Sequence, residues 1–429
     1  MAPRASSKIR PMKRLLGVVG NGLIVGMLAA CGGSPLQPPI PPSGLPLPTT
    51  PMPQGPIASS PTSATLATPS APSPAGVTLP ADTAPLPPPI VQGKSRWVPV
   101  RWAELPGLTE DPLHEAWNAW LKSCEKPGAT FAPLCGEVRR LSIGTLDEQR
   151  TWLVMRLQPY RVEPVQADPG GAQGVVQGLL TSYYEPVLEA SRSANADFKV
   201  PLYQPPLAAA GQALRKPWFT RQEIDTLPQA QAALKGREIA FLADPVDALV
   251  LQIQGSGRVL ITGRDGSKIM VRLAFAGSND QPYKSVGRWL IDQGLIRDAS
   301  WPGIKAWTLQ NPQRVQEMLW SNPRTVFFRE EPLPEADASL GPKGAQGVPL
   351  TPGRSIAVDP GSIPYGTPVW LSSAGPMVNL QRLVFAQDTG SAITGAVRAD
   401  YFAGWGPQAA ELAGRLKQPL SLWVLWPRR

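Results

Sequence analysis

The side chains available for chemistry in this 429-residue chain are few in kind. It contains a single histidine, His114, which argues against a Ser-His-Asp triad, a Cys-His pair and a histidine-bound metal. Only Cys124 and Cys135 lie away from the N-terminus, and two cysteines alone do not make a zinc site. We therefore expect no metal and no other cofactor. Carboxylates, hydroxyls and lysines remain as the groups that can act.

The densest group of polar residues lies near the C-terminus and contains two aspartates. Asp388 follows an apolar run, and Asp400 is followed by Tyr401 and Phe402. An apolar setting and a second nearby carboxylate both raise the pKa of an aspartate. An aspartate with a pKa near 3.9 is about 0.1% protonated at pH 7, whereas one shifted to about 6 is roughly 10% protonated. Asp400 is therefore a candidate general acid, and a role in a turn or cap is the alternative.

The run Asp388-Thr389-Gly390 also matches the motif of aspartic proteases. Those enzymes need two apposed aspartates that share a proton. The motif occurs once in this chain, so a protease site would require a symmetric dimer. The protease interpretation is therefore disfavoured.

The elements that must position these residues are mostly strands. Val259 to Thr262 and Ile269 to Phe275, separated by Asp265-Gly266, predict a β-hairpin. Further short strands with Pro and Gly turns between them are expected at Ser355–Val358, Pro368–Leu371, Arg382–Ala386 and Leu420–Leu425. Many short strands and few short helices predict a mainly β protein, built of β-barrels with appended helices.

A few helices are expected beside these strands. Apolar residues at helical spacing predict one from Leu113 to Leu121. The pattern Thr220-x-x-Glu223 is typical of a capping box and predicts a helix that runs toward Leu234. Two more helical faces are formed by Tyr283, Val286, Leu290 and Ile291, and by Val315 and Leu319.

Residues 1–31 have the features of a secretory signal. Five basic residues precede an uncharged run from Leu15 to Met27, which is too short to span a membrane. The run ends in Leu28-Ala29-Ala30-Cys31, which resembles a lipobox with an acylated cysteine; an ordinary cleaved signal is the alternative. The residue after this cysteine is Gly32 and not an aspartate, which resembles the sorting signal of outer-membrane lipoproteins. We therefore expect a lipid-anchored protein of the outer membrane that faces the periplasm.

Residues 32–95 are expected to form a disordered tether. The stretch from Pro35 to Pro89 holds 19 of the 52 prolines, and Asp82 is its only charged residue. Such a composition buries too little apolar surface to offset the entropy of ordering. The rest of the chain is long enough to bury one or two large cores.

The net charge and the expected export of the protein limit the kinds of partner that it can bind. The net charge of +9 favours an anionic partner, and export makes nucleic acid unsuitable, which points to anionic polymers of the envelope. Contact with the membrane is expected through the lipid on Cys31, and the sequence identifies no protein partner. In an oxidising compartment Cys124 and Cys135 are expected to form a disulfide, with two free thiols as the alternative.

Several longer motifs follow one another in order from about Trp97 to the C-terminus: Tyr183-Tyr184-Glu185-Pro186, Gln254-Gly255-Ser256-Gly257-Arg258, Ala276-Gly277-Ser278-Asn279, Asn322-Pro323, Arg354 to Pro360, Gln387-Asp388-Thr389-Gly390 and Asp400-Tyr401-Phe402. Together they resemble the membrane-bound lytic murein transglycosylase A family, with Asp359, Asp388 and Asp400 as its three C-terminal aspartates. Two positions depart from the family pattern, because Ser182 stands where glycine is usual and Thr325 where tyrosine is usual.

The resemblance implies two domains with a substrate groove between them. A double-psi β-barrel would be assembled from residues 96–186 and 323–429. A smaller β-barrel would be inserted at residues 187–322.

The resemblance also implies an activity. Members of this family cut peptidoglycan glycan strands between N-acetylmuramic acid (MurNAc) and N-acetylglucosamine (GlcNAc) and leave 1,6-anhydroMurNAc ends. Asp400 matches the family's acid/base, and Asp388 is expected to order it or to raise its pKa. The expected groove-lining residues are Tyr183, Tyr184, Gln254 and Ser256, although the glycine-rich run around the last two could simply form a bulge. A non-catalytic peptidoglycan-binding lipoprotein and a glycan hydrolase that uses water are the alternatives.

Overall fold

The computed structural model describes residues 83, 85–165, 177–207 and 216–428. The expected signal sequence, Cys31 and most of the expected tether lie outside the described residues. Within the described part of the chain, no helix combines the length and the apolar character that crossing a membrane requires.

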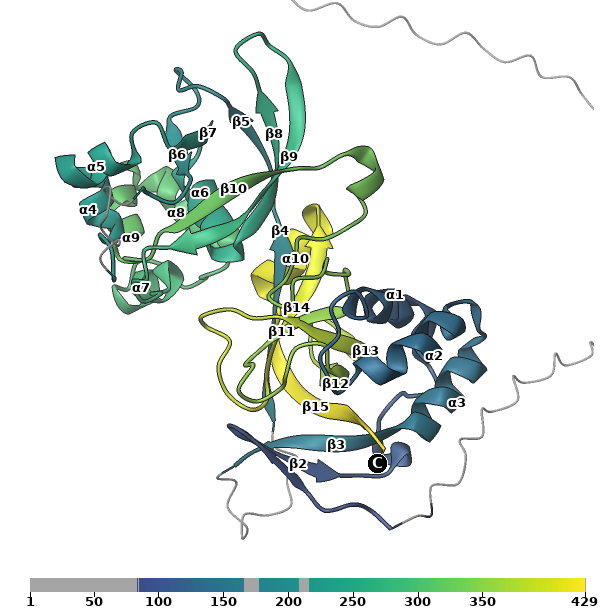
Figure 1. Ribbon diagram of the computed structural model, residues 1–429. Coiled ribbons are helices and arrows are strands. Elements are labelled where there is room, and N and C mark those ends of the chain that lie inside the picture. Colours follow the sequence, from purple (N-terminus) through teal and green to yellow (C-terminus); the bar gives the residue numbers. More distant parts are fainter. Residues whose placement is uncertain (1–82, 84, 166–176, 208–215, 429) are drawn as a thin grey trace, which may run out of the picture. The chain divides into compact units, whose positions relative to one another are not determined.

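The first of two sheets has nine strands, drawn from both ends of the described chain (Figure 1). They are β1 (Ile90–Gln92), β2 (Ser95–Pro99), β3 (Leu157–Pro164), β4 (Gly178–Glu185), β11 (Ser355–Val358), β12 (Pro368–Ala374), β13 (Asn379–Asp388), β14 (Arg398–Trp405) and β15 (Lys417–Pro427). Their order is β1-β2-β3-β15-β12-β13-β11-β14-β4, and β4 also pairs with β15. The six strands from β15 to β4 therefore close into a barrel, which confirms the expected fold class.

Apolar side chains fill the inside of this barrel. Leu180 of β4, Ile356 of β11, Val384 of β13 and Val424 of β15 belong to one buried cluster. Successive residues of a strand point to opposite faces. Residues next to these apolar positions therefore face away from the barrel interior, where polar groups can be placed.

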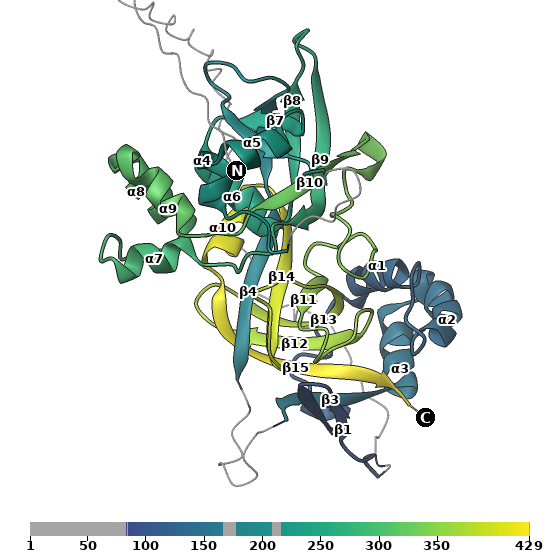
Figure 2. The same cartoon turned by 60° about the vertical axis from the view of Figure 1, so that its left-hand side comes forward.

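Three helices cover one flank of the barrel: α1 (Leu113–Ser123), α2 (Cys135–Arg140) and α3 (Leu146–Arg156). Figures 1 and 2 both show them together at the side where β13 lies. Trp120 of α1 packs its ring against Phe385 of β13, with the ring centroids 5.3 Å apart. A disulfide between Cys124 and Cys135 joins the end of α1 to the start of α2. The predicted helix from Leu113 is confirmed, and a fourth helix, α10 (Pro407–Arg415), packs on β4 and β14.

The second sheet has six strands in the order β10-β9-β8-β5-β7-β6. They are β5 (Val187–Ser191), β6 (Val200–Tyr203), β7 (Glu238–Leu242), β8 (Ser256–Thr262), β9 (Lys268–Ser278) and β10 (Val326–Pro332). The predicted hairpin is confirmed as the antiparallel pair β8–β9. Because β10 pairs with β9, this sheet extends past residue 322.

Short helices accompany the second sheet: α4 (Arg221–Thr226), α5 (Pro228–Leu234), α6 (Pro245–Gln254), α7 (Val286–Asp292), α8 (Trp301–Gln310) and α9 (Val315–Trp320). The capping box of Thr220 and Glu223 is present, but the single helix predicted from it is wrong. The chain breaks at Leu227 because the residue before a proline is disfavoured in the helical conformation. α7 starts after Ser285, so Tyr283 precedes the helix.

A buried ion pair network lies where the first sheet passes into the second. Glu185, the last residue of β4, is fully buried and accepts from the Nε atoms of both Arg258 and Arg272. The guanidinium of Arg258 also lies 3.6 Å from the ring centroid of Trp405 in β14. Removing one partner of such a network leaves an uncompensated buried charge, which makes this junction sensitive to mutation.

Candidate active site

Asp400 lies in the middle of β14, on the outer face of the barrel. Its neighbours Ala399 and Tyr401 are buried in the barrel core, so the alternation of the strand turns Asp400 to the other face. In the parallel ladder with β4, Asp400 stands opposite Thr181. The strand pairing therefore brings the carboxyl and the threonine hydroxyl together, although 219 positions separate them in the sequence.

A short chain of hydrogen bonds holds the Asp400 carboxyl. The Thr181 hydroxyl donates to Oδ1 of Asp400. Nη2 of Arg398 donates to the same hydroxyl oxygen at 2.8 Å, which leaves the Thr181 proton free to point at the carboxyl. Burial raises the pKa of Asp400 above its ordinary value, while the Thr181 hydrogen bond and the Arg398 charge act in the lowering direction. The net upward shift is the one that a general acid needs.

Asp388 ends β13 and is held by three donors. The Tyr183 hydroxyl donates to Oδ2 at 2.9 Å, and the backbone N–H of Ala345 donates to Oδ1 at 2.9 Å. The backbone of Thr389 is the third donor. Burial nevertheless raises the pKa of Asp388, and the negative charge of Asp400 contributes in the same direction. The two carboxyls therefore influence each other's protonation.

Tyr183 is hydrogen-bonded to Asp388 and is influenced by the charges of both aspartates. Burial and the charges of both Asp388 and Asp400 raise the pKa of its hydroxyl well above the usual value. The hydroxyl therefore stays protonated and serves as a hydrogen-bond donor to Asp388. Its ring packs against Phe402, with the centroids 5.3 Å apart.

Asp359, the third aspartate of the motif, has a structural role, because its carboxylate binds three donors. Lys94 Nζ and the backbone N–H of Gly395 donate to Oδ2, each at 2.9 Å, and the N–H of Gly361 donates to Oδ1 at 3.0 Å. Although burial acts to raise its pKa, these hydrogen bonds and the Lys94 charge together lower it. Asp359 is therefore an ionised anchor for the loop that leads into β14.

Two pockets open beside the aspartates. The Asp400 pocket has a volume of about 190 Å³ and the Asp388 pocket a volume of about 630 Å³. Gly390 and Ser391 line both, as do Gln252, Ile253, Arg324 and Val326. Residues of α6, of the segment that leads into β10 and of the loop after β13 are thus shared by the two pockets, one of which contains Asp400 and the other Asp388.

The predicted groove residues fall into two groups. Tyr183, Gln254 and Ser256 line the Asp388 pocket. Tyr184 lines neither pocket, because it packs on the helical cluster of the second sheet. Its backbone N–H donates to Oε1 of Gln254 at 2.9 Å, so Tyr184 contributes to the pocket only by holding Gln254.

Sequence reasoning missed Thr181 and Arg398. Arg398 precedes Asp400 by two positions, and the alternation of a strand would place both side chains on one face. That signal was lost because no strand was expected at residues 398–405. Thr181 offers no local signal, since only the closure of the barrel brings β4 beside β14.

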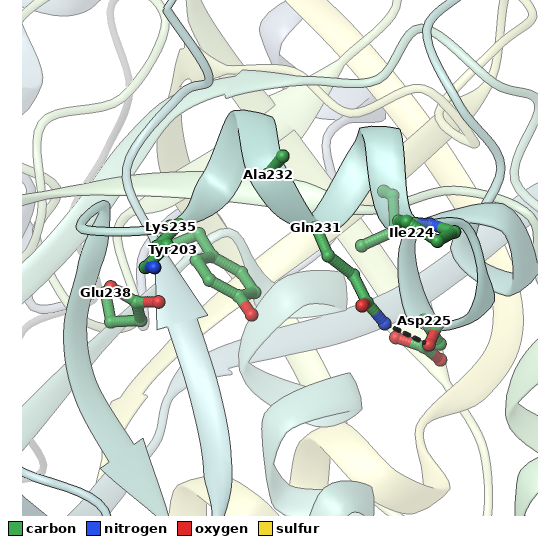
Figure 3. Close-up of a pocket in the computed structure, with 8 residues that line it drawn as sticks. Tyr203, Ile224, Asp225, Gln231, Ala232, Lys235 and Glu238 are labelled. Atoms are coloured by element: carbon green, nitrogen blue, oxygen red, sulfur yellow. Dashed lines mark hydrogen bonds between the residues drawn. The ribbon is translucent and has the colours of Figure 1, made fainter. Parts of the chain in front are cut away.

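Another hollow, of about 520 Å³, lies among α4, α5 and the strands β6 and β7, and none of the predicted site residues lines it. In Figure 3 the Tyr203 ring lies beside Lys235 and Glu238, and Gln231 reaches the backbone oxygen of Asp225. Burial, Glu238 and Asp225 raise the pKa of Tyr203 to about 12. This hydroxyl therefore stays protonated at neutral pH and is unsuited to accept a proton there.

Two family models match the two parts of the structure. Residues 179–329 match the MltA specific insert domain, and residues 354–426 match the 3D domain. The first covers the second sheet and β4, and the second covers the strands that carry the three aspartates. The chain is thus a barrel protein of the 3D-domain class with an MltA-type insert.

Three known proteins are similar to this chain. The membrane-bound lytic murein transglycosylase A of Vibrio cholerae is 33% identical over 283 residues, which are 63% of this chain and 70% of that protein. The lytic transglycosylase LtgG of Burkholderia pseudomallei is 41% identical with a TM-score of 0.53, and the match covers 80% of this chain and 100% of that one. The Escherichia coli MltA structure with bound chitohexaose is 25% identical with a TM-score of 0.61, covering 78% and 95%. This chain belongs to the membrane-bound lytic murein transglycosylase A family.

Proposed function

We propose that this protein is a peptidoglycan lytic transglycosylase that uses Asp400 as its single acid/base. It cleaves the β-1,4 bond between MurNAc and GlcNAc and leaves a 1,6-anhydroMurNAc end. The names of its relatives and the chitohexaose bound by the Escherichia coli structure support a glycan substrate. The role of Asp400 rests on its position in the lining of a pocket, where burial raises its pKa.

In the first half of the reaction Asp400 acts as an acid. Its proton passes to the glycosidic oxygen while the bond from that oxygen to C1 of MurNAc breaks, and positive charge develops at C1. Thr181 already donates to Oδ1, so Oδ2 is the oxygen that carries the transferable proton. The carboxylate that remains is stabilised by the same hydroxyl and by the Arg398 charge.

In the second half the same carboxylate acts as a base. It accepts the proton of the C6 hydroxyl of MurNAc as that oxygen bonds to C1 and closes the anhydro ring. A hydrolase needs a second carboxylate to activate water, whereas this reaction supplies its own nucleophile. Well-oriented intramolecular reactions reach effective molarities of about 10⁵ M or more, which favours ring closure over attack by water.

Asp388 acts on Asp400 through charge and position. The charge of Asp400 raises the pKa of Asp388. Because the repulsion between two carboxylates is reciprocal, ionised Asp388 in turn disfavours ionisation of Asp400. Hydrogen bonds from Tyr183 and Ala345 fix Asp388 at the wall of its own pocket. Gln254 and Ser256 are groove-lining residues in this proposal, and Asp388 is a positioning residue.

Mass spectrometry of the products released from purified sacculi tests the function. Fragments ending in 1,6-anhydroMurNAc are expected. Reducing MurNAc ends would identify a hydrolase that uses water, and sacculi that are bound but not cut would identify a binding protein. Either result would overturn the proposal.

We also propose that Cys31 is acylated and holds the protein at the outer membrane, facing the periplasm. The lipobox-like Leu28-Ala29-Ala30-Cys31 supports the anchor, and the relatives are named as membrane-bound. Incorporation of radiolabelled palmitate is expected in the wild type and absent in Cys31→Ser. A wild-type protein that takes up no palmitate would contradict the anchor.

A further inference from the structure

The lining of the Asp388 pocket is strongly cationic. It includes Lys126, Arg324, Arg329 and Lys343, and Asp388 is the only carboxyl among its lining residues. A single carboxyl cannot balance four cations, even when it is ionised. The pocket therefore presents an excess of positive charge next to the proposed catalytic groups.

The two lysines among these cations are free of carboxylate partners within the described residues. Arg329 pairs with Glu331 at 2.7 Å. Lys126 and Lys343 are exposed and form no ion pair within the described residues. The nearest acidic neighbour of Lys126 in sequence, Glu125, pairs with Lys122 at 3.1 Å. Both ammonium groups are therefore available to a ligand.

A well-held loop connects these lysines to Asp388. Lys343 precedes Ala345, whose N–H donates to Asp388. The next residue, Gln346, donates its backbone N–H to the oxygen of Gln387 at 3.0 Å and its side-chain amide to the oxygen of Lys126 at 3.2 Å. The same loop thus fixes the carboxyl, carries one lysine and binds the backbone of the other.

The Lys126 ammonium lies against this loop at Gly347. A Cβ atom added to Gly347 would come within 2.9 Å of Lys126 Nζ, so nothing larger than glycine fits there without moving the lysine. Gly347 has a φ of +84°, which also favours glycine. The loop therefore carries Lys343 and packs against Lys126, and both lysines line the pocket.

The glycan backbone offers these cations no opposite charge. GlcNAc carries no charge, and the lactyl group of MurNAc is uncharged once a peptide is attached to it by an amide bond. The peptide stems carry free carboxylates from their acidic residues and C-terminal alanine. The cationic part of the groove lining matches the charge of these stems and not that of the sugar backbone.

We propose that Lys126 and Lys343 bind the stem-peptide carboxylates of a muramic residue in the groove, so that the enzyme prefers strands with stems over bare glycan. Arg324, which lines both pockets, extends the positive lining toward Asp400. The inference rests on the proposed function, since it assigns the substrate of that same groove. The pairs are solvent-exposed, so the preference weakens as salt screens them.

The test compares Lys126→Met/Lys343→Met with the wild type on two substrates: glycan strands that keep their stems and strands stripped of stems by an amidase. Methionine keeps most of the side-chain length and removes the charge. The matched control, Lys235→Met/Lys268→Met, removes two charges from exposed lysines that do not line the Asp388 pocket. The readout is the ratio of kcat/KM on stem-bearing strands to kcat/KM on stripped strands.

The wild type and the control are expected to share one ratio above unity, and the pocket variant to lower it about three- to tenfold, as for the loss of two exposed ion pairs. The fall should come mainly through KM and shrink at high salt. An unchanged ratio in the pocket variant, or an equal fall in the control, would overturn the inference.

If the wild type cut neither substrate, the proposed lytic activity would be refuted, but binding of the stems by the two lysines could still be tested. Co-sedimentation of the two kinds of strand would then compare the pocket variant with the control. A selective loss of stem-bearing strands in the pocket variant would support the binding site, and equal retention would refute it.

Discussion

Thr181→Val tests the hydrogen-bond chain that holds Asp400. Valine has nearly the shape of threonine, but it can neither donate to Oδ1 of Asp400 nor accept from Nη2 of Arg398. The strand pairing of β4 with β14 uses backbone atoms and should survive. The substitution therefore removes one stabiliser of the Asp400 carboxylate and leaves the barrel in place.

The expected size and sign follow from this contact. A hydrogen bond to a charged group contributes about 1.5–3 kcal/mol, and one pKa unit corresponds to about 1.4 kcal/mol. Because the Thr181 hydroxyl favours the ionised form, its loss raises the Asp400 pKa by about one to two units. Asp400 then stays protonated to higher pH, so the descending limb of the kcat/KM profile moves up by the same amount.

The assay is the pH profile of anhydro-muropeptide release from soluble strands. Thr181→Ser is the matched control, since serine keeps the hydroxyl and should keep the wild-type limb. A descending limb that stays in place in Thr181→Val, or one that moves equally in Thr181→Ser, would refute the proposed chain from Arg398 to Asp400.

Three further results are expected. Asp388→Asn should retain measurable activity with the descending limb moved down, because it removes a charge that disfavours ionisation of Asp400; an inactive variant would contradict this. Asp400→Asn should raise Tm at neutral pH, because burial raises the pKa of Asp400 in the folded state and ionisation above about pH 4 therefore destabilises the folded wild type. The gain in Tm should vanish below the unfolded pKa of about 3.9. A lower Tm of the variant at pH 7 would contradict this prediction. Replacing both Cys124 and Cys135 with alanine should lower the free energy of unfolding by about 3 kcal/mol, as for a loop with a separation of 11 residues, whereas unchanged denaturation by urea would show that the bridge contributes nothing.

Local patterns in the sequence predicted most of the helices and strands, but not how the strands pair to close the barrel. The hairpin at β8–β9 and the helix α1 follow from turn residues and periodicity, which act over a few neighbours. The helix predicted after Thr220 was divided because Pro228 outweighs the capping signal. The boundaries at residues 187 and 322 stay a prediction.

The site was predictable only in part for the same reason. Composition and motif context singled out Asp388 and Asp400, and the structure gives both a raised pKa. Thr181 could not be found, because its contact depends on the pairing of two strands that are distant in the chain. The sequence likewise could not show that Lys126 and Lys343 lie near Asp388, because only the folded chain brings their loop to this carboxyl.

The central claim is that one carboxyl, Asp400, serves as both acid and base. Its most direct test is Asp400→Asn on purified sacculi, with binding followed by sedimentation and products by mass spectrometry. Binding should persist, because the amide is nearly the same shape, while formation of 1,6-anhydro ends should fall by at least ~10²–10⁴. Release of anhydro-muropeptides by Asp400→Asn at close to the wild-type rate would contradict the account.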